Sequence, residues 1–353
     1  MTTHLRRWGL LALAGLPVLG IGAAVALGPR LPDPVLAAVE APAPPTEVPA
    51  PDPPQAAEPS PSSSSTVVLL PSQPGLPLAA DGRHYPLVPG DPQVVADLLV
   101  SLEEALRSPD TPAESLPALG HQQQVILRVL AVREGQAQEV RQRLSPRWQA
   151  VLDHHLGARR AFLSMRRRGP GSPTLPAWRI VAPEPAEKLL GYYRSAAAAT
   201  GIDWEVLAAV NLVESGMGRI DGVSVADARG PMQFLPTTWA EPGIGKGNIR
   251  DPHDAIHAAA RYLVRRGGLK DIRKGLWGYN NSDYYGKAVL HYAALLREDP
   301  AAYTSLYHWE IHYASNAGDL WLPVGYSQTK PIPVALYLQR FPASAPPAAN
   351  RGA

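Results

Sequence analysis

One acidic residue near the end of a hydrophobic helix is the strongest candidate for chemistry in this sequence. The stretch 203–218 reads DWEVLAAVNLVESGMG, in which Asp203 can begin a helix and the two glycines can end it. Residues 207–212 are apolar on every face except at Asn211, a pattern typical of a buried helix. Glu214 falls in the last turn, where desolvation and the negative end of the helix dipole both raise the pKa of a carboxyl group. A carboxylic acid that stays protonated near neutral pH is what cleavage of a glycosidic bond requires.

A simpler interpretation of Glu214 remains open at this point. A glutamate at a helix C-terminus can point at water, or it can pair with a nearby cation such as Arg219. Both cases would leave the carboxyl group ionised and without a catalytic role.

The composition excludes several classes of function. The 353 residues include no cysteine, 18% charged residues and a net charge of +2. The absence of cysteine rules out disulfides, thiolate nucleophiles and cysteine metal sites, and the small net charge gives no indication of nucleic-acid binding. Proline is abundant, 39 of the 353 residues, mostly outside the central region, so the folded part is shorter than the chain.

The N-terminus predicts the compartment. Arg6 and Arg7 precede an apolar run, residues 8–27, that is just long enough to cross a bilayer. The positive-inside rule then leaves the N-terminus in the cytoplasm and sends the rest across the membrane. We interpret residues 1–30 as an uncleaved anchor in preference to a cleaved signal peptide; either one makes the protein extracytoplasmic, on the cell-wall side.

Four further segments follow. Residues 31–85 are rich in Pro, Ala and Ser and predict a disordered linker, because they bury too little apolar area to fold. Residues 86–170 predict a small helical extension of unknown role, in which His154 and His155 read as an ordinary pair and not as a metal site. Residues 171–300 predict a helical domain around Glu214. Residues 301–353 predict a short hairpin after Leu306 and a frayed C-terminal end.

The central region resembles a known family. Four blocks occur in order: NLVESGMGR at 211–219, ARGPMQFLPTTW at 228–239, DPHDAIHAAARYL at 251–263 and GYNNSDYY at 278–285. Together they resemble the catalytic domain of lytic transglycosylases of the lysozyme-like superfamily, and most of all the membrane-bound B type in its actinobacterial form. The expected fold class is therefore all-α, a lysozyme-like helical catalytic domain with an N-terminal helical extension, a membrane segment and a disordered Pro-rich linker.

The resemblance also implies roles for single residues. Glu214 would be the one general acid and base. Ser215 would help to hold the backbone of the site, and Ser224 would contact the N-acetyl group of a sugar. The residues implied to bind substrate, directly or through the loops around it, are Ser215, Ser224, Gln233, Tyr279 and Asn280.

The last block departs from the family pattern. Many relatives follow Tyr-Asn with Pro-Ser-Asp-Arg-Tyr, whereas this chain has Asn281 and Tyr284 in place of the proline and the arginine. Losing these two residues is expected to loosen the loop and to affect sugar contacts more than the acid.

Two other patterns in the sequence could form a site. His253 and His257 have the i, i+4 spacing of a zinc-binding helix, but no third ligand is evident, so we predict no metal and no cofactor. A hydrolase would need a second carboxylate, for which Asp221, Asp227 and Asp283 are candidates, although all three read as loop or cap residues.

The implied reaction uses Glu214 twice. It would protonate the glycosidic oxygen of the MurNAc–GlcNAc β-1,4 bond and then take the proton from the C6 hydroxyl group, which closes a 1,6-anhydro ring. The expected partners are peptidoglycan glycan strands and, through the N-terminal segment, the membrane, with no nucleic acid. The alternatives are a lysozyme-type hydrolase of the same bond and a non-catalytic peptidoglycan-binding or scaffold module.

Overall fold

The computed structural model describes residues 70–71, 74–165 and 171–351. These residues are mostly helical, in agreement with the predicted helical class, and they also contain short strands in antiparallel pairs, β1 with β6, β2 with β3 and β4 with β5. The described helices are α1 (Pro92–Ala105), α2 (Leu116–Val132), α3 (Glu134–Arg143), α4 (Pro146–Met165), α5 (Ala186–Thr200), α6 (Trp204–Ser215), α7 (Pro236–Trp239), α8 (Pro252–Arg265), α9 (Ile272–Tyr279), α10 (Asp283–Glu298), α11 (Ala302–Tyr307) and α12 (Val334–Arg340). The strands are β1 (Thr174–Leu175), β2 (Arg179–Ile180), β3 (Ile220–Asp221), β4 (Ile311–Ser315), β5 (Gly318–Leu322) and β6 (Ile332–Pro333), and two 3₁₀ turns are η1 (Pro342–Ser344) and η2 (Ala348–Asn350).

Local sequence signals set several helix ends. Asp91 accepts a hydrogen bond from the backbone N–H of Gln93 at the start of α1, and Asp251 accepts one from Asp254 at the start of α8, as expected for N-caps. Asp203 precedes α6 as predicted, but its carboxylate pairs with Arg297 at 2.9 Å and makes no cap hydrogen bond. Gly216 ends α6 with a left-handed φ of 61°, a conformation that glycine adopts without strain.

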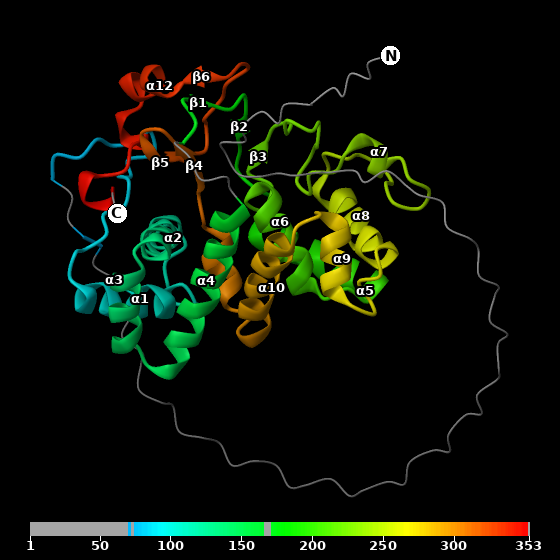
Figure 1. Ribbon diagram of the computed structural model, residues 1–353, viewed down its shortest axis with the longest axis horizontal. Coiled ribbons are helices and arrows are strands. Elements are labelled where there is room, and N and C mark those ends of the chain that lie inside the picture. Colours follow the sequence, from blue (N-terminus) through cyan, green and yellow to red (C-terminus); the bar gives the residue numbers. More distant parts are fainter. Residues whose placement is uncertain (1–69, 72–73, 166–170, 352–353) are drawn as a thin grey trace, which may run out of the picture. The chain divides into compact units, whose positions relative to one another are not determined.

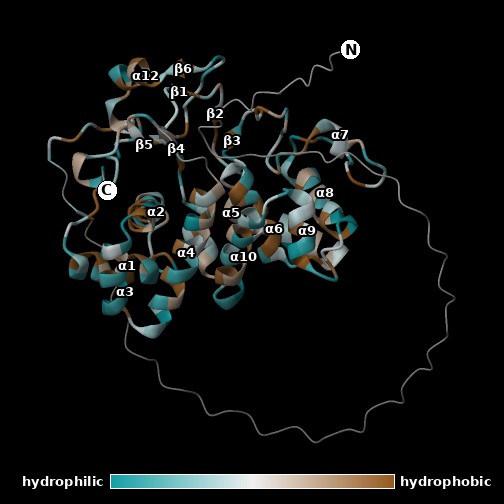
Figure 2. Cartoon of the chain, viewed as in Figure 1, coloured by the Kyte–Doolittle hydropathy of each residue, from teal (hydrophilic) through white to brown (hydrophobic). Residues whose placement is uncertain are grey.

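The predicted extension and the predicted catalytic domain share one hydrophobic core. Helix α10 packs against α4 of the extension on one side and against α6 on the other, and a single cluster of buried residues runs through all three. Figure 1 shows these helices side by side, and Figure 2 shows the hydrophobic residues that they carry. The division near residue 170 is therefore a boundary along the chain and not a gap between two cores.

The start of the folded part lies earlier than predicted. Residues 74–85, which the sequence places in the linker, pack against the hairpin formed by β4 and β5. Tyr85 is 4% exposed, and its hydroxyl group donates to the carbonyl oxygen of Asp319 at 2.7 Å. Arg83 donates to the carboxylate of Glu310 at 2.6 Å. This part of the linker prediction is corrected because the partners of the segment lie more than two hundred positions away, beyond the reach of a composition argument; residues 31–69 lie outside the described residues.

The predicted hairpin is confirmed, and the predicted frayed end is corrected. Strands β4 and β5 pair antiparallel with Ile311 opposite Leu322. The C-terminal end is held against the folded part by Asn350. Its side chain accepts a hydrogen bond from the backbone N–H of Val88 at 3.0 Å and donates one to the carbonyl of Pro86 at 2.8 Å. A single amide thus satisfies two backbone groups of the N-terminal segment.

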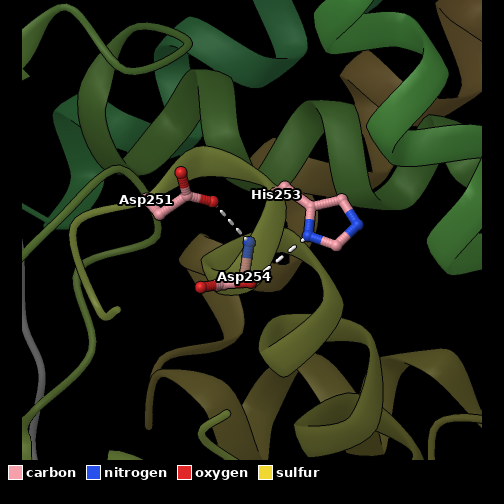
Figure 3. Close-up of side chains that lie close together, drawn as sticks. All are labelled: Asp251, His253 and Asp254. Atoms are coloured by element: carbon pink, nitrogen blue, oxygen red, sulfur yellow. Dashed lines mark hydrogen bonds and ion pairs between the residues drawn. The ribbon is translucent and has the colours of Figure 1, made fainter. Parts of the chain in front are cut away.

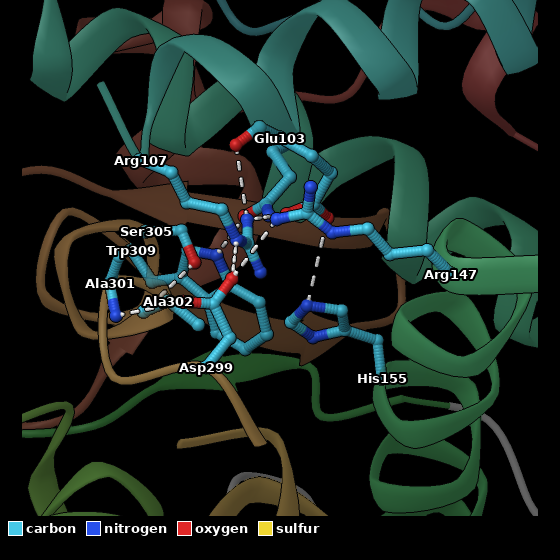
Figure 4. Close-up of polar contacts among 10 residues, drawn as sticks. Glu103, Arg107, Arg147, His155, Asp299, Ala301, Ala302, Ser305 and Trp309 are labelled. Carbon is cyan, nitrogen blue, oxygen red and sulfur yellow. Dashed lines mark hydrogen bonds and ion pairs between the residues drawn. The ribbon is translucent and has the colours of Figure 1, made fainter. Parts of the chain in front are cut away.

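A buried polar cluster joins the extension to the end of α10 (Figure 4). Glu103 lies in it, 4% exposed, and burial raises the pKa of its carboxyl group while the guanidinium of Arg107 opposes that rise. Gln123 donates to Glu103 at 2.8 Å, and Arg107 also donates to Asp299 at 2.7 Å. Trp309 completes the cluster by donating to Gln123 at 2.8 Å.

Replacing Arg107 with Ala is expected to lower the free energy of unfolding by about 3–5 kcal/mol, because the carboxyl group of Glu103 would stay buried without its counter-charge. Urea denaturation followed by circular dichroism measures the change. Arg141→Ala is the matched control, since Arg141 pairs with Asp153 where both side chains are well exposed, and such a pair contributes only about 0–1 kcal/mol. Equal effects of the two variants would contradict the structural role of the cluster.

The membrane prediction concerns residues that the structure does not describe. In the described ranges, 70–71, 74–165 and 171–351, no helix is both long enough and apolar enough to span a bilayer. The predicted segment, residues 1–30, lies outside them.

Candidate active site

Glu214 lies in the last turn of α6, where its side chain is buried and neutralised. The residue is 4% exposed. Burial is the largest influence on its carboxyl group and raises the pKa to about 8, against an opposing effect from a hydrogen bond with Tyr285. The carboxyl group is therefore protonated at neutral pH, as the apolar sequence around it predicts.

The ordinary alternative for Glu214, a pair with Arg219, does not form. The guanidinium of Arg219 donates instead to two backbone carbonyls, those of Gly216 at 3.1 Å and of Tyr307 at 2.5 Å. Arg219 thus satisfies carbonyl groups at the ends of α6 and α11, and no cation in the part of the chain that the structure describes lowers the pKa of Glu214.

The direct partner of the acid is Tyr285, from the first turn of α10. Its hydroxyl group donates to Oε1 of Glu214 at 2.8 Å, and burial holds the pKa of this phenol well above its usual value, so it stays a donor. The ring of Tyr285 stacks on that of Tyr279, with centroids 6.2 Å apart and planes 4° apart. Tyr279 in turn donates to the carbonyl of Met232 at 2.8 Å. Two of the four sequence blocks therefore converge on Glu214 through a pair of stacked tyrosines.

Replacing Tyr285 with Phe is expected to raise the pKa of Glu214 further, because the lost hydrogen bond favours the ionised form. Hydrogen bonds to charged groups contribute about 1.5–3 kcal/mol, so the alkaline limb of the pH profile of kcat/KM should move up by about one to two pH units. Tyr292→Phe is the control, since Tyr292 lies on the same face of α10 but packs against Trp309 and not against Glu214. An unchanged limb in Tyr285→Phe would show that this phenol does not tune the acid.

Ser215 and Asn211 fix the backbone that follows the acid. Both side chains are fully buried. The Ser215 hydroxyl group donates to the carbonyl of Pro231 at 2.5 Å and accepts from the backbone N–H of Gly218 at 3.0 Å. Asn211 donates to the same Pro231 carbonyl at 2.7 Å and accepts from Tyr193 at 2.6 Å. Ser215 thus holds the turn that follows Glu214 against the loop of Pro231.

Gln233 is also occupied by the backbone of its own loop. It is 6% exposed, and its side-chain amide donates to the carbonyl of Gly230 at 2.9 Å. Its φ of 46° is left-handed, a strained conformation for a residue with a side chain that is found most often at functional sites. Gly230 precedes it with a φ of 73°, and a Cβ atom there would collide with the carbonyl oxygen of Ile249. The loop is therefore held in one conformation beside Met232.

The remaining predicted residues lie at different depths. Asn280 is buried at the end of α9, where its backbone N–H donates to the carbonyl of Leu276 at 3.0 Å. Ser224 lies half-buried in the loop after β3, and its hydroxyl group accepts from the backbone N–H groups of Ala226 and Ala228 at 3.2 and 3.0 Å. Glu214 and Tyr279 are thus linked through Tyr285, whereas the contacts of Ser224 stay within its own loop.

Sequence reasoning missed Tyr285 as a site residue. On helical spacing Tyr285 shares one face with Val289 and Tyr292, and all three are buried. The one available signal is the hydroxyl group of Tyr285, because a buried hydroxyl group needs a hydrogen-bond partner.

A groove of about 770 Å³ adjoins the end of α6. Its lining includes Asn211, Gly218 and Pro231, which are the residues that hold the turn after Glu214. Charged side chains on its wall are paired with one another, since Asp221 binds both Arg179 and Arg250. The groove has a largely apolar lining with these charged pairs on its wall, and it borders the turn that follows Glu214 without being lined by Glu214 itself.

The three candidates for a second catalytic carboxylate have other partners or positions. Asp221 is held by Arg179 and Arg250, and Asp227 pairs with Arg229 at 3.0 Å. Asp283 is exposed in the first turn of α10, two positions before Tyr285 and so on a nearly opposite face of the helix. The geometry therefore favours chemistry that uses one carboxyl group.

Asp251, His253 and Asp254 bring carboxylate and imidazole groups together at the start of α8 (Figure 3). Asp251 accepts from the backbone N–H of Asp254 at 3.0 Å, and Asp254 accepts from Asn248 at 2.8 Å and contacts His253 at 3.2 Å. His257 instead contacts Ser195 at 2.9 Å. These contacts are those of a helix N-cap, and we assign the cluster to that role.

Comparison with known proteins adds one finding. Residues 191–287 match the family model described as the transglycosylase SLT domain. No curated protein and no solved structure matches the chain. The matched range begins within α5, ends within α10 and includes Glu214, Tyr285 and every predicted substrate residue. The match and the helical architecture together support the identification of residues 191–287 as a lysozyme-like transglycosylase SLT domain, a type that indicates lytic transglycosylase activity on peptidoglycan.

Proposed function

We propose that this protein is a peptidoglycan lytic transglycosylase that cleaves the MurNAc–GlcNAc β-1,4 bond, forms 1,6-anhydro-MurNAc ends and uses Glu214 as its only general acid and base. The observation that carries the proposal is the buried carboxyl group of Glu214, whose pKa of about 8 keeps it protonated at neutral pH. The likeness to the membrane-bound B type, from the four sequence blocks, is part of the same proposal.

The first step is proton transfer. Glu214 gives its proton to the glycosidic oxygen, so that the leaving sugar departs neutral, and the N-acetyl oxygen of the substrate meets the positive charge at the anomeric carbon. The carboxylate formed in this step keeps a hydrogen bond from Tyr285, which stabilises it at the moment it ionises.

The second step closes the ring. The Glu214 carboxylate takes the proton from the C6 hydroxyl group of the same sugar, the C6 oxygen bonds to the anomeric carbon, and the acid returns to its protonated state. A pKa near 8 suits both steps, because a group that must act first as acid and then as base works best near the operating pH.

The surrounding residues position this chemistry. Ser215 and Asn211 fix the turn after the acid through Pro231, and the loop of Gln233 is held next to Met232, on which Tyr279 is anchored. We infer that the groove beside Asn211 and Pro231 receives part of the glycan strand, since an apolar lining with a few polar groups suits the apolar faces and the hydroxyl groups of a sugar. Ser224, Gln233, Tyr279 and Asn280 remain the proposed substrate contacts.

A lysozyme-type hydrolase is the second candidate, on the ground that the same fold and acid suit both reactions. A hydrolase needs a second carboxylate. Asp221 and Asp227 are both paired with arginines, and this favours the transglycosylase. The compartment proposed for either enzyme is the cell-wall side of the membrane, with residues 1–30 as the anchor.

Product analysis tests the proposal. Purified peptidoglycan is incubated with the protein, and the released muropeptides are identified by mass spectrometry. Anhydro ends, lighter by one water, are expected. Reducing ends would establish the hydrolase, and the absence of any product from a folded protein would favour the non-catalytic binding module.

A further inference from the structure

A second groove, of about 500 Å³, lies between α9 and α10. It is separate from the acid. Trp277 lines it and stands two positions before Tyr279, and Lys287 lines it and stands two positions after Tyr285. Residues two apart on a helix face nearly opposite directions. Because Tyr285 is buried and Tyr279 is half-buried on the Glu214 side, Trp277 and Lys287 face away from that side.

Trp277 is the unusual residue of this groove, because 51% of it is exposed. The other tryptophans in the described ranges are buried or half-buried. Tyr284, in the first turn of α10, is another large aromatic residue at the surface, 45% exposed; it does not line the groove, but the ammonium of Lys287, which does, lies 5.6 Å from its ring centroid. An exposed tryptophan that lines a groove offers an apolar face to a ligand.

The groove combines the apolar ring of Trp277 with polar side chains around it. The polar lining residues are Arg273, Ser282, Asp283, Lys287 and His291. A pyranose ring has the matching chemistry, with apolar C–H groups on its faces and hydroxyl and amide groups around its rim. The aromatic face of Trp277 would cover the former, and the charged and hydroxyl side chains would hydrogen-bond the latter.

We propose that the groove around Trp277 is a second glycan-binding site, which holds a distant part of the strand that is cleaved at Glu214. The identity of the polymer rests on the proposed function. A second contact on the same strand raises the local concentration of the substrate at the acid, which is useful for an enzyme whose substrate is an insoluble network.

Binding measured without turnover tests this site. In the Glu214→Gln background, the added substitution Trp277→Ala is expected to weaken co-sedimentation with purified peptidoglycan about tenfold, the loss typical of removing one aromatic anchor from a binding site. Trp277→Phe keeps an aromatic face and should retain most of the affinity. Phe341→Ala is the matched control, since Phe341 is also 51% exposed but lies after α12. Equal affinity of the Trp277→Ala variant and its parent would overturn the proposal.

Turnover on two substrates separates this proposal from the proposed function. With Glu214 intact, Trp277→Ala should slow the digestion of peptidoglycan about tenfold and leave cleavage of a soluble disaccharide-repeat tetramer unchanged, because so short a chain engages only the site at Glu214. Equal slowing on both substrates would overturn the second site. If Glu214→Gln keeps full activity while Trp277→Ala still weakens binding, the acid assignment fails and the groove stands.

Discussion

Glu214→Gln is expected to lower the turnover of peptidoglycan by about a hundred- to ten-thousand-fold, the contribution of general acid–base catalysis. Gln has the shape of the protonated acid and can still accept the hydrogen bond from Tyr285, so the fold and the binding of the glycan should be retained. The measurement is the rate of release of muropeptides, separated by liquid chromatography.

Glu205→Gln is the matched control for this experiment. Glu205 lies in the first turn of the same helix, α6, at a position that is not buried. Its substitution makes the same chemical change, from a carboxyl group to an amide. Its activity should equal that of the unsubstituted protein. Full activity in a folded Glu214→Gln variant would sink the proposed mechanism and favour the binding-module alternative.

Glu214→Gln is also expected to stabilise the protein at alkaline pH, by about 3–5 kcal/mol at pH 8. The pKa of Glu214 is about 8 in the folded state against 4.5 as the ordinary value. Between these values the folded state holds a proton that the unfolded state has released, so the free energy of unfolding falls as the pH rises from about 4.5 to about 8. Below pH 4.5 both states are protonated, and the penalty vanishes.

Urea denaturation at pH 4 and at pH 8 checks this prediction. The difference in unfolding free energy between Glu214→Gln and the unsubstituted protein should be close to zero at pH 4 and large at pH 8. Glu205→Gln provides the baseline for the change from carboxyl to amide on the same helix. A constant difference across this range would show that Glu214 is not buried as a neutral acid.

Together, the two expected outcomes describe a carboxylic acid that the fold retains at a cost to its stability. Desolvation makes the carboxyl group reactive, and the same desolvation weakens the fold at the pH where the enzyme would work. The hydrogen bond from Tyr285 offsets part of that cost, which is why its removal should move the pH profile and not abolish the activity.

The sequence by itself determined the helix that carries the acid. An apolar run with a glycine at its end predicts a buried helix that stops at Gly216, and the position of Glu214 in its last turn follows from the spacing alone. The caps at Asp91 and Asp251 were readable for the same reason, since a cap is a contact between residues two or three positions apart. The raised pKa of Glu214 was also predictable in direction, because burial of the helix implies desolvation of its side chains.

Only the tertiary structure decided the partners of these elements. Tyr285 reaches Glu214 from 71 positions away, and Tyr85 reaches Asp319 from 234 positions away. The period of a helix says which side chains face inward, but it does not say which other helix they meet. For that reason the sequence placed Tyr285 in the core without assigning it to the acid, took residues 74–85 for a linker, and gave no sign that Trp277 would remain at the surface. Contacts between distant segments depend on how whole faces pack, and packing is a property of the folded chain.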